Sequence, residues 1–198
     1  MQSRGHMNSY LHARLLTKAE RKQVFKQHMI HDFPKNELRP LHMIEALVEK
    51  GNYYTYGIFR NEMLCAYAYF WEETEKQILL FDYFAVVSSM RNQGYGTQAM
   101  EVILDACKEK AGVILEVENP ARAEDEQERK VRHRRISFYE KSGLQMSEVR
   151  IYLFGVEYCM MYRSLSEGDV RSEIVSVMES LYSNTLPKPI YEKMFKVL

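Results

Sequence analysis

The order of apolar and polar residues along the chain predicts alternating strands and helices. Apolar and polar residues alternate from Tyr10 to Leu16, as in a strand with one buried face. Thr17 opens the sequence Thr-Lys-Ala-Glu, which is a capping box, and apolar residues then recur at helical spacing to about Asp32. A second helix is predicted from about Pro40 to Lys50, and Gly51 is expected to stop it.

The next segments predict strands. Tyr53–Arg60 and Met63–Trp71 flank Asn61-Glu62 and are expected to form an antiparallel hairpin. A charged connection, Glu72–Lys76, leads to the run Leu79–Val87, whose near-continuous apolar character is typical of a strand buried on both faces.

A glycine-containing loop and a helix follow this buried strand. The loop reads Arg91-Asn92-Gln93-Gly94-Tyr95-Gly96, and apolar positions recur at helical spacing from Thr97 to about Lys110. Gly112 is expected to break that helix, and Val113–Glu118 is the next predicted strand. A strand, a helix and a strand at this spacing predict a right-handed crossover with two parallel strands.

The last third of the chain begins with charge and ends with helices. Residues 121–132 are strongly charged and form either an exposed helical extension or a mobile loop, followed by a short helix over Arg134–Lys141 that Gly143 closes. Leu144–Phe154 and Val156–Ser164 predict a second antiparallel pair. The segment 166–198 predicts a helical C-terminal extension that contains an amphipathic stretch over Val170–Leu181. The fold class is therefore α/β, in the α+β sense of a central mixed sheet flanked by helices.

Composition narrows the class of protein. The 198 residues suffice for one well-filled core, so a single domain over 7–198 is expected. Met1–His6 follows no pattern and precedes a second methionine, so we expect it to be left over from expression. Lysine plus arginine and aspartate plus glutamate each total 27, which argues against a general nucleic-acid or membrane-surface role.

The cysteines indicate the compartment. Cys65, Cys107 and Cys159 lie within apolar patterns and lack metal-ligand spacing, so we expect reduced core cysteines, no metal site and a cytoplasmic protein. No apolar run approaches the roughly 20 residues that span a bilayer, and no signal peptide is visible.

The glycine loop is the first candidate for chemistry. Its glycines lie where backbone amides approach a ligand closely, and the helix behind them offers unpaired N–H groups and the positive end of a dipole. These features predict an anion site, and a cofactor that carries phosphates is its natural occupant.

Two motifs resemble those of the GNAT superfamily of N-acetyltransferases. Arg91–Gly96 fits the family's Arg/Gln-x-x-Gly-x-Gly/Ala signature after a strand that ends in Ala-Val. Phe138-Tyr139-Glu140-Lys141-Ser142-Gly143-Leu144 is similar to its second signature, with Leu144 in place of the usual phenylalanine. The separation of the motifs is longer than usual by about the charged insert, and the resemblance leaves out the helical tail.

The resemblance implies acetyl-CoA as the cosubstrate. The amides from Gln93 to Thr97 would hold its pyrophosphate, and the backbone of Val86 and Val87 would pair with the pantetheine arm as another strand would. Arg91 would add a charge contact to phosphate, or is an exposed loop arginine. The implied cofactor-binding set is Val86, Val87, Arg91, Asn92, Gln93, Gly94, Tyr95, Gly96 and Thr97.

The resemblance also implies a catalytic acid. The tyrosine of the second signature lies near the cofactor sulfur in the family, so Tyr139 would donate a proton to the leaving thiolate, since a phenol with a pKa near ~10 is protonated at pH 7. The alternative is a core tyrosine bonded to backbone.

A general base is harder to place. Alternation puts Glu116 and Glu118 on one face of their strand, and Asp82 lies in the buried strand. Glu118 is the first choice because it is nearest a carboxyl end, where parallel strands open a ligand crevice. The alternative is that these carboxylates pair with arginines from the set Arg132, Arg134 and Arg135, and some members of the family use no side-chain base.

The predicted function is transfer of an acetyl group from acetyl-CoA to an amine of a small molecule or peptide by direct attack on the thioester, in a monomer or homodimer. A non-catalytic acyl-CoA-binding sensor or interaction module is the alternative. A plain nucleotide-binding α/β protein is a third reading, and it predicts stabilisation by ATP or NAD instead.

Overall fold

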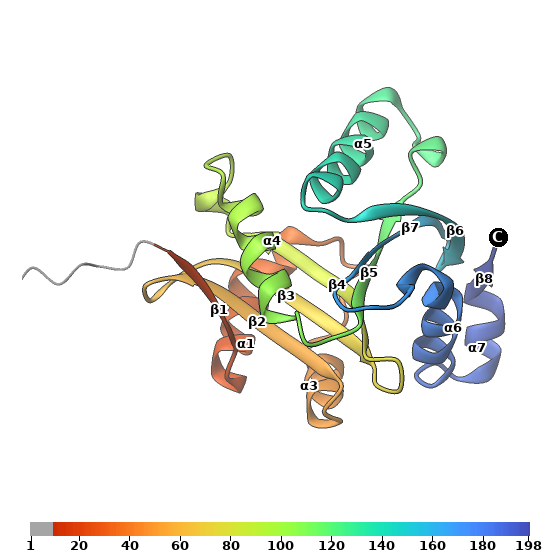
Figure 1. Cartoon of the computed structure of the whole chain (residues 1–198), viewed down its shortest axis with the longest axis horizontal. Coiled ribbons are helices and arrows are strands. Elements are labelled where there is room, and N and C mark those ends of the chain that lie inside the picture. The colour runs from red at the N-terminus through yellow and green to blue at the C-terminus, as the bar shows by residue number, and fades with distance from the viewer. Residues whose placement is uncertain (1–9) are drawn as a thin grey trace, which may run out of the picture. The chain divides into compact units, whose positions relative to one another are not determined.

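The computed structural model describes residues 10–198, so Met1–His6, the segment expected to be left over from expression, lies outside the described residues. The strands form one mixed sheet in the order β1-β2-β3-β4-β5-β7-β6-β8 (Figure 1). The predicted mixed sheet flanked by helices is therefore confirmed. The strands are β1 (Leu11–Leu15), β2 (Tyr53–Arg60), β3 (Met63–Glu73), β4 (Ile78–Val86), β5 (Gly112–Glu118), β6 (Gln145–Leu153), β7 (Val156–Ser164) and β8 (Phe195–Val197).

The helices agree with the predicted order. They are α1 (Lys18–Val24), α2 (Ile30–Asp32), α3 (Leu41–Glu49), α4 (Tyr95–Ala106), α5 (Glu126–Lys141), α6 (Val170–Ser183) and α7 (Lys188–Met194). β4 and β5 are parallel, with Ile78–Leu80 opposite Gly112–Ile114, which confirms the predicted parallel pair.

The chain divides into two compact units that share β3 and β4. One unit contains the residues up to Tyr69 together with Tyr83–Ala106, and the other contains Phe70–Asp82 and Cys107–Leu198. The single domain expected over 7–198 thus stays a prediction.

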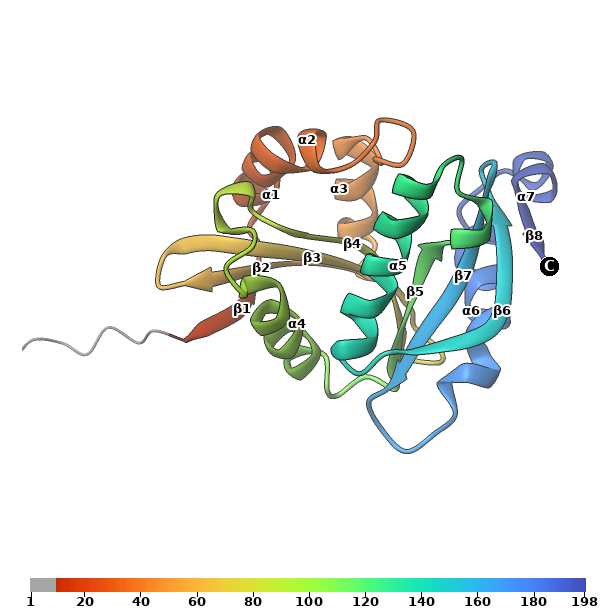
Figure 2. The same ribbon diagram turned by 90° about the horizontal axis from the view of Figure 1, so that it is seen from above.

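In the first unit, helices cover both faces of the edge strands. β1 pairs with β2 in antiparallel register, from Leu11 opposite Arg60 to Leu15 opposite Tyr56. The helices α1, α2 and α3 lie on one side of β1 and β2, and α4 lies on the other (Figure 2). Asn61 adopts a φ of 54° in the turn after β2, a conformation that asparagine tolerates better than most residues, so the hairpin forms without a glycine.

The first helical run is capped as predicted and contains a wide turn. The Thr17 Oγ1 accepts from the Glu20 amide at 3.3 Å, and the Glu20 carboxylate accepts from the Thr17 amide at 2.8 Å. A π-helical turn, Phe25–Met29, then joins α1 to α2. The run ends at Asp32, where the sequence predicts it to end.

In the second unit, α5 and α6 lie on opposite sides of β5 and β7 (Figure 1). α6 approaches β5 so closely that a Cβ at Gly112 would lie 2.5 Å from the Cγ2 of Val170. The predicted amphipathic face of α6 is buried, with Ile174, Val177 and Met178 fully enclosed. β8, which the sequence does not predict, pairs with β6 at the edge of the sheet.

Two predicted boundaries are wrong. Glu72 and Glu73 belong to β3 and are buried, because the ammonium of Lys110 lies 2.5 Å from Glu72 and the hydroxyl of Ser180 donates to Glu73 at 3.3 Å. α4 ends at Ala106 and not near Lys110, and the Ala111 amide donates to the Gln77 carbonyl at 3.0 Å. Each boundary depends on partners distant in sequence, which local patterns do not report.

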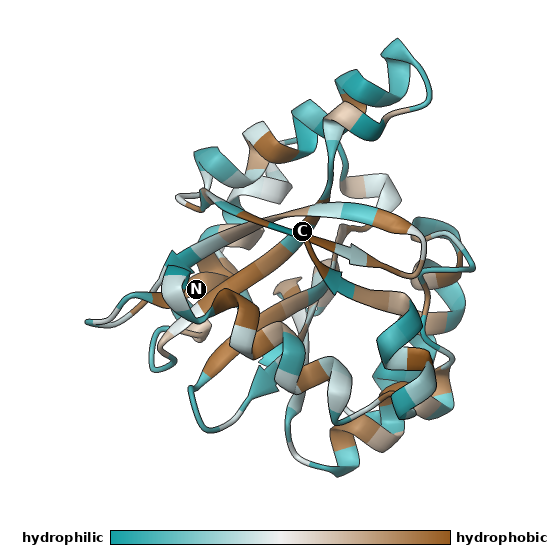
Figure 3. Ribbon diagram, turned by 90° about the vertical axis from the view of Figure 1, so that its right-hand side faces the viewer, coloured by the Kyte–Doolittle hydropathy of each residue, from teal (hydrophilic) through white to brown (hydrophobic). Residues whose placement is uncertain are grey.

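The charged insert is helical. α5 begins at Glu126 and not near Arg134, so it takes up most of residues 121–132, and of the two alternatives the helical extension is confirmed. Asp125 caps it by accepting from the Glu128 amide at 2.7 Å. Figure 3 shows α5, the uppermost helix, as largely hydrophilic, and the ion pair of Arg129 with Glu126 shows how such a helix is stabilised along its own surface.

Replacing Thr17 by alanine tests the cap of the first helical run. The Thr17→Ala variant leaves the Glu20 amide without its acceptor, so we expect a loss of about 1 kcal/mol in the free energy of unfolding, measured by urea denaturation. Thr17→Ser keeps the hydroxyl and should lose less than half as much. Equal losses in both variants would contradict the capping role.

Candidate functional site

The loop between β4 and α4 is shaped by two residues with left-handed backbone. Asn92 has a φ of 61° and Gly94 a φ of 80°. A Cβ at Gly94 would meet only the Gln98 Nε2, at 3.9 Å, so the backbone conformation and not lack of space requires glycine there. We call Arg91–Gly94 the glycine loop.

α4 begins directly behind the glycine loop. Its first residue is Tyr95, so Gly96 lies in the first helical turn and not in the loop where the sequence predicts it. The first intrahelical bond runs from the Gln98 amide to the Gly94 carbonyl, and amides earlier in the turn have no partner within the helix. The amides of Tyr95, Gly96 and Thr97 therefore form the kind of N-terminus that binds anions.

The end of β4 directs its backbone groups to two edges. The Val87 amide donates to the Cys65 carbonyl of β3 at 2.9 Å. Because backbone groups of successive residues in an extended chain point to opposite edges, those of Val86 point away from β3. Of the two valines in the predicted cofactor set, Val86 is thus the one whose backbone can pair with a further extended group.

Arg91 is engaged on two sides. Its Nε donates to the Val86 carbonyl at 2.9 Å, and its Nη2 donates to the Asp32 carboxylate. The side chain of Asp32 is only 7% exposed, and the hydroxyl of Tyr67 donates to its other oxygen at 2.7 Å. Burial and the Asp32 charge raise the pKa of Tyr67, so its phenol remains a donor.

Three further residues near the glycine loop lie in no sequence motif and were not predicted as site residues: Asp32, Tyr67 and Arg60. The Arg60 guanidinium, at the end of β2, donates to the Tyr95 hydroxyl at 2.7 Å and brings a further positive charge to the start of α4. Arg60 lies far from the loop in sequence and in no motif, so only the hairpin geometry reveals it.

In the second unit, α5 places three of its residues along one face. Arg132, Arg135 and Tyr139 are spaced by three and four positions, which aligns them on a helix. Tyr139 is half-buried and makes no hydrogen bond through its hydroxyl within residues 10–198, and Phe138 lies edge-on to its ring. Burial raises the pKa of the Tyr139 phenol and the charge of Arg135 opposes that rise, so the phenol is protonated at neutral pH.

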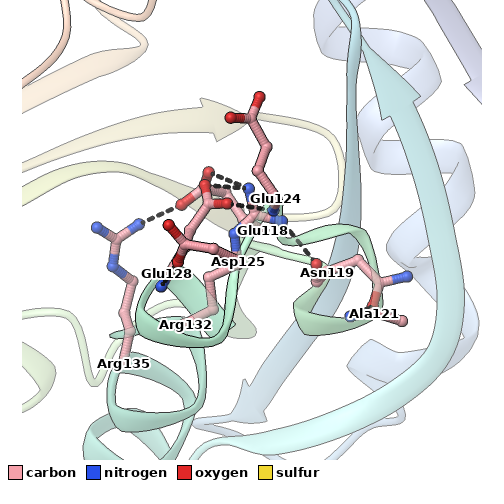
Figure 4. Close-up of polar contacts among 8 residues, drawn as sticks. All are labelled: Glu118, Asn119, Ala121, Glu124, Asp125, Glu128, Arg132 and Arg135. Carbon is pink, nitrogen blue, oxygen red and sulfur yellow. Dashed lines mark hydrogen bonds and ion pairs between the residues drawn. The ribbon is translucent and has the colours of Figure 1, made fainter. Parts of the chain in front are cut away.

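Glu118 is paired with arginines. Its oxygens lie 3.1 Å from Arg132 and 3.2 Å from Arg135 (Figure 4). Arg132 also donates to the Asn119 carbonyl at 2.7 Å and to Glu128 at 2.8 Å, and it is 8% exposed. These contacts agree with the alternative interpretation of the sequence, in which a candidate carboxylate pairs with Arg132 and Arg135 and is not a free base.

The other two candidate carboxylates have different surroundings. Glu116 accepts from the Tyr182 hydroxyl of α6 at 3.2 Å, so Glu116 and Glu118 contact different helices. Asp82 lies half-buried in β4. The structure therefore places Glu118 beside Arg135 of α5, the helix that also carries Tyr139, and places Glu116 beside α6.

No group of three histidine, cysteine, aspartate or glutamate side chains in residues 10–198 is arranged to hold a metal ion. Within the same residues, no helix combines the length and the apolar character needed to cross a membrane.

Comparison with known proteins places the chain among acetyltransferases. The family model described as the acetyltransferase (GNAT) family matches residues 15–144. This range includes the glycine loop and the second signature. No curated protein sequence matches the chain.

Solved structures share the fold at low sequence identity. A protein from Bacteroides thetaiotaomicron described as a GNAT-family acetyltransferase has a TM-score of 0.68 and 21% identity, over 86% of this chain and 96% of that one. The ribosomal-protein-S18-alanine N-acetyltransferase of Escherichia coli has a TM-score of 0.58 and 17% identity, over 80% of this chain and 96% of that one. Spermidine N-acetyltransferase of Vibrio cholerae, in complex with CoA and spermine, has a TM-score of 0.57 and 13% identity, over 81% of this chain and 98% of that one.

Removing Arg132 tests whether it anchors α5 to the end of β5. The Arg132→Met variant keeps the length of the side chain but leaves the partly buried Glu118 without one of its cations, so we expect a loss of about 3 kcal/mol in the free energy of unfolding. Arg129→Met is the matched control, because Arg129 forms an exposed pair on the same helix and should change stability by less than about 0.5 kcal/mol. Similar losses in both variants, measured by urea denaturation, would contradict the anchoring role.

Proposed function

Since the chain belongs to the GNAT acetyltransferase family, we propose that it transfers the acetyl group of acetyl-CoA to an amine by direct attack on the thioester. The observation that carries this proposal is the turn at Asn92 and Gly94, which exposes the first amides of α4 directly after β4. That arrangement suits the pyrophosphate of a CoA molecule.

The proposed cofactor site uses backbone more than side chains. The amides from Gln93 to Thr97 hold the pyrophosphate, and the amide of Val86, whose backbone groups point away from β3, donates to the pantetheine arm while the Val86 carbonyl accepts from Arg91. A main-chain N–H at the end of β4 then donates to the thioester oxygen as negative charge develops on it. The Val87 amide, already bonded to Cys65, contributes by fixing this end of β4 in the sheet.

The transfer proceeds in two steps, attack of the amine on the thioester and collapse of the tetrahedral intermediate. The neutral amine attacks the carbonyl carbon, the C=O electron pair moves to oxygen, and a tetrahedral intermediate forms. Its collapse re-forms the C=O bond and breaks the C–S bond, and the CoA thiolate takes a proton from Tyr139. The nitrogen gives up its proton to water, which returns a proton to the Tyr139 phenolate, so the products are the amide and free CoA. Tyr139 suits the acid role because its hydroxyl has no partner in residues 10–198, and the raised pKa of its phenol keeps the proton in place until the thiolate forms.

The acceptor amine must be deprotonated for the transfer to occur. An alkylamine with a pKa near ~10.4 is about one part in a thousand neutral at pH 7, so the amine must lose a proton before it attacks. Glu118, Glu116 and Asp82 remain the candidates. Glu118 is paired with arginines of α5 and Glu116 accepts from the Tyr182 hydroxyl of α6, which supports roles for these two carboxylates in holding the two helices. We therefore propose water as the first acceptor of the proton that the amine loses.

The acceptor class is proposed as a small-molecule or peptide amine. The structural neighbours named for spermidine and for the alanine of a ribosomal protein show how wide that class is for this fold. We also propose a cytoplasmic location, because Cys65, Cys107 and Cys159 are free thiols, as in reducing compartments. The proposed assembly is a monomer or homodimer.

A thiol-release assay tests the function. Purified protein is incubated with acetyl-CoA and, in turn, with polyamines, aminoglycosides, amino acids and peptides, and free CoA is measured. The proposal predicts that acetyl-CoA raises the melting temperature and that at least one amine releases thiol. Stabilisation by acetyl-CoA without release would favour a non-catalytic acyl-CoA sensor, and stabilisation by ATP or NAD alone would contradict both functions.

Replacing Tyr139 by phenylalanine tests the acid. We expect kcat to fall about 10²-fold while the Kd of acetyl-CoA stays within about twofold, because only the proton donor is removed. Tyr162→Phe is the matched control, since the Tyr162 hydroxyl donates to the Gln145 side chain at 3.0 Å, and the kcat of this variant should not change. A parallel loss of binding and turnover in Tyr139→Phe would contradict the acid role.

A further inference from the structure

Asp32 occupies a position that is unfavourable for a carboxylate. It is the last residue of α2, where the helix dipole places partial negative charge, and its side chain is 7% exposed. Burial of a charged group is destabilising unless the group is paired and hydrogen-bonded. A residue in such a place therefore depends on its partners, and those partners indicate what it does.

Both oxygens of Asp32 are used. The Tyr67 hydroxyl of β3 donates to Oδ2 at 2.7 Å, and the Arg91 guanidinium donates to Oδ1. Tyr67 is fully buried and fixes one side of the carboxylate, and the edge-on ring of Phe33 packs against the Tyr67 ring. The carboxylate is thus held rigidly against the sheet and presents its other oxygen to the glycine loop.

Arg91 connects this carboxylate to the end of β4. Its Nε donates to the Val86 carbonyl at 2.9 Å while Nη2 donates to Asp32, so one edge of the guanidinium is fully engaged. The side chain is nevertheless 46% exposed, and Nη1 makes no hydrogen bond within the described residues. A guanidinium held by one edge keeps donors on the other edge for a second anion.

The π-helical turn accounts for the direction of Asp32. A π turn contains one more residue than an α turn, so the residues that follow Phe25–Met29 are rotated relative to α1. Such turns occur often at functional sites, and here the turn comes directly before the three residues that end in Asp32.

We propose that Asp32 is a positioning residue that acts through Arg91. It holds the guanidinium against the Val86 carbonyl, so that the free edge of Arg91 meets the pyrophosphate of acetyl-CoA and the glycine loop is fixed before the cofactor binds. This inference rests on the proposed function, because it assumes that the anion at the loop belongs to acetyl-CoA.

A double-mutant cycle on Asp32 and Arg91 tests the proposal. The Kd of acetyl-CoA is measured by isothermal titration calorimetry for wild type, Asp32→Asn, Arg91→Gln and the double variant. We expect Asp32→Asn to raise the Kd about tenfold in the wild-type background and by less than about twofold in the Arg91→Gln background. Asp32→Asn removes a negative charge near an anion site, so a purely electrostatic role predicts the opposite sign, tighter binding.

Glu45→Gln is the matched control. Glu45 forms a pair with Arg21 whose side chains are 13% and 10% exposed, on α3 and α1 of the same unit, and it does not contact the loop. Its variant should lower the melting temperature yet leave the Kd within about twofold of the wild-type value. A raised Kd in Glu45→Gln would show that loss of stability alone weakens binding and would overturn the assignment.

The remaining outcomes are distinct. An unchanged or lower Kd in Asp32→Asn, or an equal effect in both backgrounds, overturns the positioning role while leaving the proposed function standing. Failure of the wild-type protein to bind acetyl-CoA overturns the proposed function and the inference together.

Discussion

The left-handed turn at Asn92 and Gly94 is the constraint on which the site depends. It allows the chain to leave a buried strand and start a helix within a few residues, so the first amides of α4 are presented directly behind the end of β4. Because a Cβ at Gly94 would meet only the Gln98 Nε2, at an ordinary contact distance of 3.9 Å, the constraint is one of backbone torsion. The side chains around the loop, Arg91 above all, add charge to a shape that the backbone already provides.

Buried charge has a different task in each unit. In the first unit, the Asp32 carboxylate joins the end of a helix to the loop through Arg91. In the second, Arg132 joins α5 to the end of β5 through Glu118 and the Asn119 carbonyl. Both arginines carry several donors in a planar fork, which lets one side chain bind a carboxylate and a carbonyl at once.

Local patterns predicted most elements, and distant contacts explain the differences. The capping box at Thr17 and the amphipathic face of α6 are formed by residues that lie close together in the sequence, so local patterns predicted both. β8 and the burial of Glu72 were not, because each depends on partners far along the chain, β6 in one case and Lys110 in the other. The insert folded as helix through its own ion pairs, which a hydrophobic pattern does not detect.

The candidate site divides in the same way. Arg91, Gly94 and Tyr139 were readable because they lie in contiguous motifs, whereas Asp32, Tyr67 and Arg60 reach the loop only through the packing of separate elements. The contacts of Glu118 likewise depend on a separate element, since its arginine partners come from α5.

If the amides at the start of α4 hold the phosphates of CoA, a CoA titration followed by ¹⁵N–¹H correlation spectra will detect the contact. We expect the amide signals from Gln93 to Thr97 to shift most and in a saturable way. Saturable binding of CoA that leaves these five signals unmoved, while signals elsewhere shift, would contradict it.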